Sequence, residues 1–125
     1  MANNYCQSST FVDIPENQIE EAKTIVSQVE KELESSDEEY VGFLTKFSDD
    51  GVLIYNKESI DPNHVEFLIK ELVEQFNLPG KHLCSWAYTC SKLRINEFGG
   101  GAFVVQKGKD TVWVDAVQEV LLKVN

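Results

Sequence analysis

The sequence predicts an α+β fold: a two-layer sandwich in which helices cover a mainly antiparallel sheet. Three features predict it. Two segments repeat apolar residues at helical spacing, several others are rich in aromatic and β-branched residues, and short turns separate them. With 125 residues, 42% of them hydrophobic, the chain can bury its own core. We therefore expect one globular domain over residues 1–125, with residues 1–9 as a flexible N-terminal tail.

The first predicted helix follows Pro15, a residue that suits a first helical turn. Asp13 and Glu16 have the spacing of a capping box, and the polar residues 35–37 end the helix. The apolar positions recur every three or four residues and share one face: Ile19, Ala22, Val26, Val29 and Leu33.

A β-hairpin is expected next. Residues 40–47 alternate with period two, residues 48–51 (Ser-Asp-Asp-Gly) favour a turn, and residues 52–55 form the return strand. A second helix begins at Asp61-Pro62, which supply an N-cap and a first helical residue. The segment 77–80, Asn-Leu-Pro-Gly, ends that helix.

The remainder predicts a longer hairpin and a terminal helix. Residues 84–95 are extended in character, residues 97–101 connect them to a strand at 102–106, and residues 107–110 form another turn. A last strand at 111–114 leads into a short helix whose apolar positions are Ala116, Val117, Val120, Leu121 and Val124.

The expected order is α-β-β-α-β-β-β-α. If the residues from Thr10 to Asp13 add a strand at the start, the first six elements follow βαββαβ, the ferredoxin-like order. Either order gives an α+β two-layer sandwich.

Charge is distributed unevenly along the chain, whose formal net charge is −10. Residues 1–60 hold 13 Asp and Glu against 4 Lys, whereas residues 61–125 hold 8 against 7 Lys and Arg. Such a field repels nucleic acid and anionic membranes and attracts basic partners. The N-terminus lacks the features of a secretory signal, and three cysteines suit a reducing compartment, so we expect a cytoplasmic protein.

Carboxylates concentrate around the end of the first predicted helix. At a helix C-terminus they oppose the macrodipole, at a cost of about 0.3–1 kcal/mol each, which suggests that they serve a purpose. The alternative is an ordinary solvated helix end. The proposed partner-binding residues are Glu30, Glu32, Glu34, Asp37, Glu38 and Glu39.

A second candidate is the glycine-rich connection of the long hairpin. Three consecutive glycines let the backbone approach a ligand and offer N–H groups to an anion, with nearby cations and hydroxyls to assist. The pattern matches neither a P-loop nor a dinucleotide-binding turn, and a plain connection is the alternative. The candidate ligand-binding residues are Tyr88, Ser91, Lys92, Arg94, Gly99, Gly100 and Gly101.

Cys84, Cys90 and His64 are the residues on which an enzyme hypothesis would depend. Six strand residues would separate the two cysteines by roughly 20 Å, too far for a disulfide or a shared zinc. They are better explained as core residues of one sheet face. A nucleophile pair with His64 stays open, because catalytic partners meet in space.

These patterns favour a non-enzymatic acidic protein that docks on a basic surface of a partner, as an inhibitor of a nucleic-acid-acting protein would (immunity, antitoxin or phage counter-defence type). The first alternative is a small-ligand module that binds a phosphate-bearing metabolite or nucleotide at residues 99–101. The second is a Cys-dependent enzyme. No cofactor, metal, direct nucleic-acid contact or membrane contact is expected. An edge strand in the second hairpin favours a homodimer.

Overall fold

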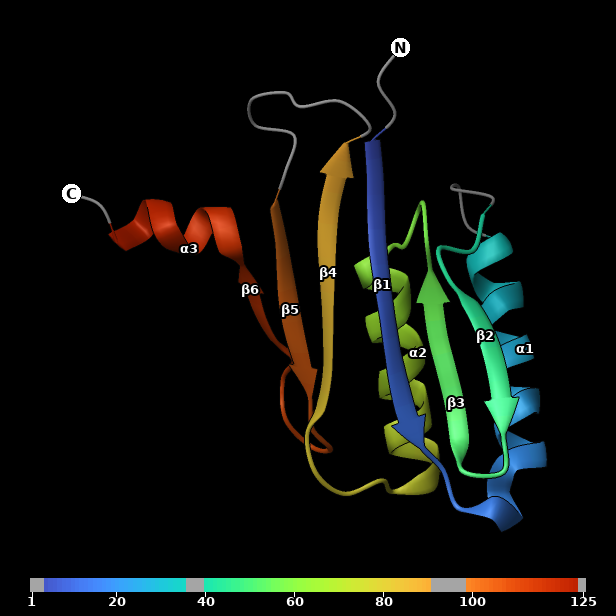
Figure 1. Cartoon of the computed structure of the whole chain (residues 1–125). Helices are drawn as coiled ribbons and strands as arrows, with labels where there is room; N and C mark the ends of the chain where they lie inside the picture. The colour runs from blue at the N-terminus through green and yellow to red at the C-terminus, as the bar shows by residue number, and fades with distance from the viewer. Residues whose placement is uncertain (1–3, 36–39, 91–98, 124–125) are drawn as a thin grey trace.

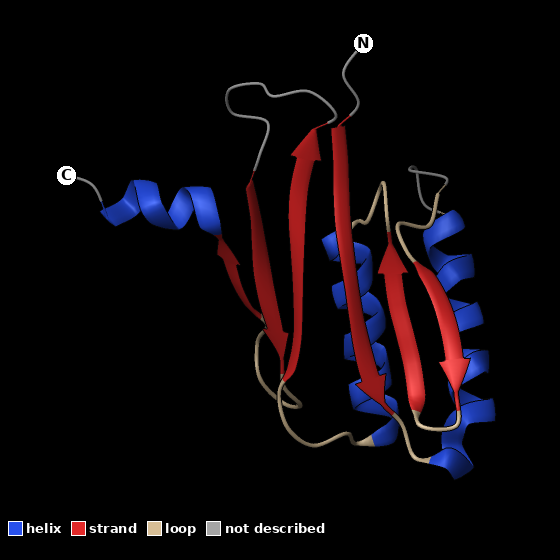
Figure 2. Ribbon diagram, viewed as in Figure 1, coloured by secondary structure: helices blue, strands red, loops and turns tan. Residues whose placement is uncertain are grey.

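The computed structural model describes residues 4–35, 40–90 and 99–123. In these residues the chain forms a six-stranded antiparallel sheet with strand order β2-β3-β1-β4-β5-β6, and helices pack against it. Figure 1 shows α1 and α2 behind the sheet, while its other face is left open. The same layers are distinguished by colour in Figure 2. The predicted α+β two-layer architecture is confirmed.

The elements follow the predicted order with one strand added at the start. They are β1 (Asn4–Asp13), a 3-10 turn (Glu16–Gln18), α1 (Ile19–Glu34), β2 (Leu44–Ser48), β3 (Gly51–Asn56), α2 (Pro62–Phe76), β4 (His82–Cys90), β5 (Gly99–Val105), β6 (Val112–Asp115) and α3 (Ala116–Lys123).

Strand β1 lies between β3 and β4, antiparallel to both, so that β1-α1-β2-β3-α2-β4 has the ferredoxin-like order and the neighbour order β2-β3-β1-β4. The strand starts at Asn4 rather than Thr10. A flexible tail over residues 1–9 is therefore wrong for residues 4–9, because sheet neighbours on both sides hold these polar residues.

The sheet contains a seam beside β1. Backbone pairing joins β1 to β4 over residues 4–7 and to β3 over residues 8–13. After residue 7, where the backbone pairing of β1 with β4 ends, two side-chain hydroxyls of β1 bond to β4 instead. Ser8 Oγ donates to the Ser85 carbonyl at 2.5 Å, and Thr10 Oγ1 donates to the Leu83 carbonyl at 2.8 Å. Side chains thus replace part of the backbone ladder at the centre of the sheet.

The two long helices begin in different ways. Asp61 caps α2 as predicted, since its carboxylate accepts hydrogen bonds from Asn63 N at 2.9 Å and His64 N at 3.4 Å. Asn77 ends that helix in the left-handed conformation, with a φ of 53°. No side-chain bond caps the 3-10 turn or α1 within the residues described, so the predicted capping box is absent; Asp13 belongs to β1 instead.

The core lies between the sheet and the two helices. Alternate residues of the central strands, such as Val12, Ile54 and Phe103, meet apolar residues of α1 and α2. Each fully buried aliphatic side chain contributes about 1.5–3 kcal/mol relative to exposure. None of the described helices is long and apolar enough to cross a membrane.

The C-terminal elements lie outside this core. Helix α3 leaves the sheet at β6 and extends sideways from it (Figure 1), with its main contacts to β5 and β6. Three consecutive aliphatic residues of α3 are 61–77% exposed: Val120, Leu121 and Leu122.

Candidate functional site: an acidic helix layer and a groove on the open sheet face

The carboxylates predicted to bind a partner lie partly on α1. Glu30 and Glu34 are four residues apart and share one side of the helix, whereas Glu32 lies on the other side, because two residues advance a helix by roughly 200°. Burial, and secondarily the Glu34 carboxylate, raise the pKa of Glu30. Asp37, Glu38 and Glu39 lie outside the described residues.

The ion pairs of the helix layer leave these carboxylates unneutralised. Lys23 lies 3.2 Å from Glu20, and Lys70 lies 3.9 Å from Glu66. Among the described residues, no lysine lies within ion-pair distance of Glu30, Glu32 or Glu34. Their charge therefore acts on whatever approaches α1.

The acid separates by layer in space. Residues 16–34 contain six Glu and two Lys, and α2 adds three Glu and one Lys. The six strands together contain only Asp13, Lys46 and Asp115 as charged residues besides His82, whose charge depends on pH. The protein thus has an acidic helix side and a nearly uncharged sheet.

The three consecutive glycines are the start of β5. Gly99, Gly100 and Gly101 pair with Tyr88, Ala87 and Trp86 of β4, so strand structure begins inside the predicted connection. A Cβ on Gly101 would lie 2.6 Å from Cζ2 of Trp86 and 2.4 Å from the carbonyl oxygen of Val114. This packing explains why position 101 requires glycine, which the sequence alone did not show.

The other residues predicted around that connection are divided. Tyr88 is 41% exposed, and it lies beside Gly99 in the ladder. Ser91, Lys92 and Arg94 lie outside the described residues. The structure therefore places Tyr88 beside the glycines.

The Cys84 thiol is buried and contacts a hydroxyl, with its Sγ 3.4 Å from Ser8 Oγ. Burial raises its pKa, so the thiol is protonated near neutral pH. His64 is held elsewhere: its Nδ1 accepts a hydrogen bond from Gly42 N at 3.0 Å, and its Nε2 lies 3.5 Å from Asp61 Oδ2. His64 thus ties the segment before β2 to the start of α2. The side chain of Cys90 lies outside the described residues.

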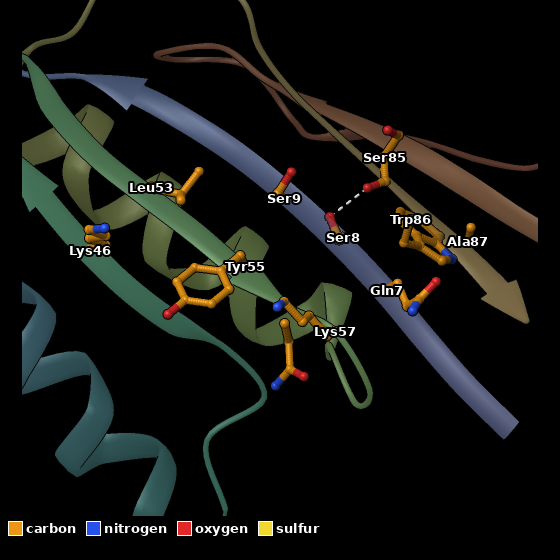
Figure 3. Close-up of a pocket in the computed structure, with 11 residues that line it drawn as sticks. Gln7, Ser8, Ser9, Lys46, Leu53, Tyr55, Lys57, Ser85, Trp86 and Ala87 are labelled. Atoms are coloured by element: carbon orange, nitrogen blue, oxygen red, sulfur yellow. Dashed lines mark hydrogen bonds between the residues drawn. The ribbon is translucent and has the colours of Figure 1, made fainter. Parts of the chain in front are cut away.

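A groove of about 740 Å³ lies over the seam, within the usual size range of small-molecule sites. Figure 3 shows Lys46, Tyr55 and Lys57 on one flank and Gln7, Ser85 and Ala87 on the other, with the helix ribbons behind the strands. The lining residues come from four strands and from the residue after β3. The remaining ones are Ser8, Ser9, Leu53, Asn56 and Trp86.

The groove differs from the rest of the molecule in charge and in hydrogen-bonding groups. Its lining contains two lysines and no carboxylate, in a chain of net charge −10. Asn56 is fixed in place because its Oδ1 accepts from Glu58 N at 2.9 Å and Ser59 N at 3.0 Å. The groove is therefore suited to an anionic group held by ammonium, amide and hydroxyl groups.

Sequence reasoning missed the groove because its residues come from segments up to eighty positions apart. In the structure, Gln7 and Ser9 are exposed and alternate with the half-buried residues Cys6, Ser8 and Thr10. This alternation could be used only if the predicted tail was first recognised as a strand.

No protein-family model, no curated protein and no solved structure matches this chain. Within the described residues, no three His, Cys, Asp or Glu side chains are grouped so as to hold a metal ion. The site therefore has to be judged on its own geometry.

Proposed function

We propose that this protein is a non-enzymatic binding protein whose acidic helix layer docks on a basic surface of a partner protein. The observation that carries the proposal is the separation of charge by layer, with nine Glu and three Lys in residues 16–34 and α2. Opposite fields accelerate association and fix orientation, and this effect weakens as salt rises.

The dimensions of α1 agree with such a role. Its 16 residues make a rod about 24 Å long, with carboxylates exposed along its solvent side. A row of negative charge on a rigid helix resembles the phosphates that basic grooves of nucleic-acid-acting proteins bind. An inhibitor of that class is the function that we favour.

The test compares two charge reversals of equal size. Glu32→Lys with Glu34→Lys alters α1, and Asp49→Lys with Asp50→Lys alters the exposed β2–β3 turn by the same amount. We expect a partner isolated with the wild-type protein to associate at least about tenfold more slowly with the α1 variant, and near the wild-type rate with the turn variant.

Surface plasmon resonance at low and high salt measures both association rates, and circular dichroism checks that each variant is folded. Equal slowing by the two variants would show that net charge, rather than α1, governs binding. An unchanged rate in the α1 variant would reject the docking proposal.

The groove supports a second function, a module that binds a phosphate- or carboxylate-bearing small molecule. Its two lysines, Lys46 and Lys57, favour this ligand class. We expect one compound of a nucleotide and metabolite panel to raise the melting temperature, and Lys46→Gln with Lys57→Gln to abolish the shift, while Lys109→Gln retains it. A shift that survives in the double variant and disappears in Arg94→Ala would instead place the ligand near residues 91–101.

A further inference from the structure

Six large apolar side chains are exposed together at the C-terminal end of the sheet. They belong to β6 and α3, and their exposed fractions range from 41 to 77%. We call this area the β6–α3 surface: Val112, Trp113, Val114, Val120, Leu121 and Leu122. Trp113 packs beside Phe103 and Trp86, so Val112 and Val114 point to the opposite face of β6. Large apolar side chains exposed on two adjoining elements favour contact with another molecule.

Helix α3 is apolar around too much of its circumference for its own sheet to cover it. Val120, Leu121 and Leu122 are consecutive, so they span roughly 200° of the helix. A helix normally packs its apolar side against a partner and leaves its polar residues in water. The exposure of all three residues leaves this side of α3 available to another molecule.

The two edge strands of the sheet, β2 and β6, also differ in how readily they could pair with a strand of another molecule. The outer strand β2 carries Lys46 at its centre, a feature that opposes pairing with another strand. The other outer strand, β6, has the sequence Val-Trp-Val-Asp and presents no charge before its last residue. The edge at β6 is thus the one open to strand addition.

The charge of this end of the molecule permits a second copy to approach. Residues 106–123 contain three Lys and three Asp or Glu, so this end is neutral in a chain of net charge −10. A basic partner would be drawn to the helix layer instead. A second copy can approach here without bringing the two acidic layers together.

The neutral end is also complementary to itself. A two-fold axis pairs identical strands antiparallel, which brings the segment before β6 of one copy beside the start of α3 in the other. Lys107 and Lys109 precede β6, and Glu119 lies in the first turn of α3. Opposite charges would therefore face each other twice across the axis.

We propose that a second copy of this chain covers the β6–α3 surface, with β6 pairing antiparallel to its counterpart and α3 packing across the junction. A standard interface uses roughly 20–30 residues per side and buries about 800 Å² on each partner, and residues 106–123 could supply at most 18 of them. The sheet then continues from one copy into the other.

Light scattering after size exclusion, with sedimentation equilibrium, tests the proposal on the full chain. We expect a mass twice the 14.2 kDa of one chain. Val112→Lys places in β6 the lysine that β2 already has, and Leu122→Glu places a charge on α3. Each variant is expected to weaken the dimer at least about tenfold, equivalent to about 1.4 kcal/mol.

Both substituted residues are highly exposed, at 63 and 77%, so the monomer should remain folded, which circular dichroism and urea unfolding verify. Leu44→Lys, at a 53% exposed residue of the opposite edge, is the matched control and should leave the mass unchanged. A monomeric wild-type protein overturns the proposal, as does a dimer that survives either Val112→Lys or Leu122→Glu, or one that Leu44→Lys disrupts equally. The docking proposal is tested separately, since Glu32→Lys with Glu34→Lys should not change the mass.

Discussion

The need for glycine at position 101 comes from Trp86, a residue on the neighbouring strand. The Trp86 indole occupies the space where a Cβ would be, and it also packs near Trp113 and Phe103, with ring centroids 5.9 and 6.3 Å away. From the sequence alone, three glycines suggested a ligand loop, because a run of glycines does not reveal which side chain lies over it. The strand register was needed to see that Trp86 and Gly101 are opposite each other.

Replacing Gly101 by Ala should therefore destabilise the protein, although alanine is normally accepted in a strand. The added methyl group would overlap the indole ring and the Val114 carbonyl, and overpacking of this kind costs about 1–3 kcal/mol. Urea unfolding followed by tryptophan fluorescence measures the change. Ala102→Val, on the next residue of β5, is the control and should stay within about 0.5 kcal/mol. Equal stability of the Gly101 variant would contradict this explanation of the glycine.

At the scale of elements, local chemistry predicted α2 well and β1 poorly. Asp61, Pro62 and Asn77 mark the ends of α2 through bonds within a few residues, so the sequence contained the whole signal. The polar residues 4–9 become a strand only because β3, β4 and residues 58–60 bond to them from 46 to 86 positions away. No local pattern shows such a partner.

In helix α1, the ionisation of Glu30 lowers the free energy of unfolding by an amount that depends on pH. Burial, and then Glu34, raise the pKa of Glu30, so the folded protein holds this proton more tightly than the unfolded chain does. The stability that protonation of Glu30 contributes is present below its ordinary pKa and is lost as the pH rises through the raised value. Above the raised pKa the carboxylate is ionised, and this ionisation opposes folding.

Glu30→Gln should consequently stabilise the protein at pH 7 by about 0.3–0.5 kcal/mol, a value kept small because the side chain is partly exposed to solvent. The gain should disappear near pH 3. Urea midpoints at both pH values provide the measurement. Glu21→Gln, in the first turn, is the matched control, since a carboxylate there is favourable to the helix and its loss should give no gain. A pH-independent gain would contradict the role assigned to Glu30.

For the whole molecule, the sequence predicted the architecture and the acidity but not where the acid lies. The element order led directly to the α+β sandwich, and the ferredoxin-like order followed once β1 was included. The groove was out of reach because it is formed where four strands meet in space, and Lys46 and Lys57 acquire their shared setting only there. Likewise, the sequence shows that acidic residues are concentrated in the first half of the chain, whereas the structure shows that they are concentrated in the helix layer.

The contrast between the two sheet edges has a consequence for assembly size. If copies join through β6, the strands left at both outer ends are β2, and each displays Lys46. Growth is then self-limiting: it stops at a closed pair, whereas a sheet with two bare edges would propagate into fibres. In such a pair, the single lysine on each β2 edge would oppose the addition of further copies.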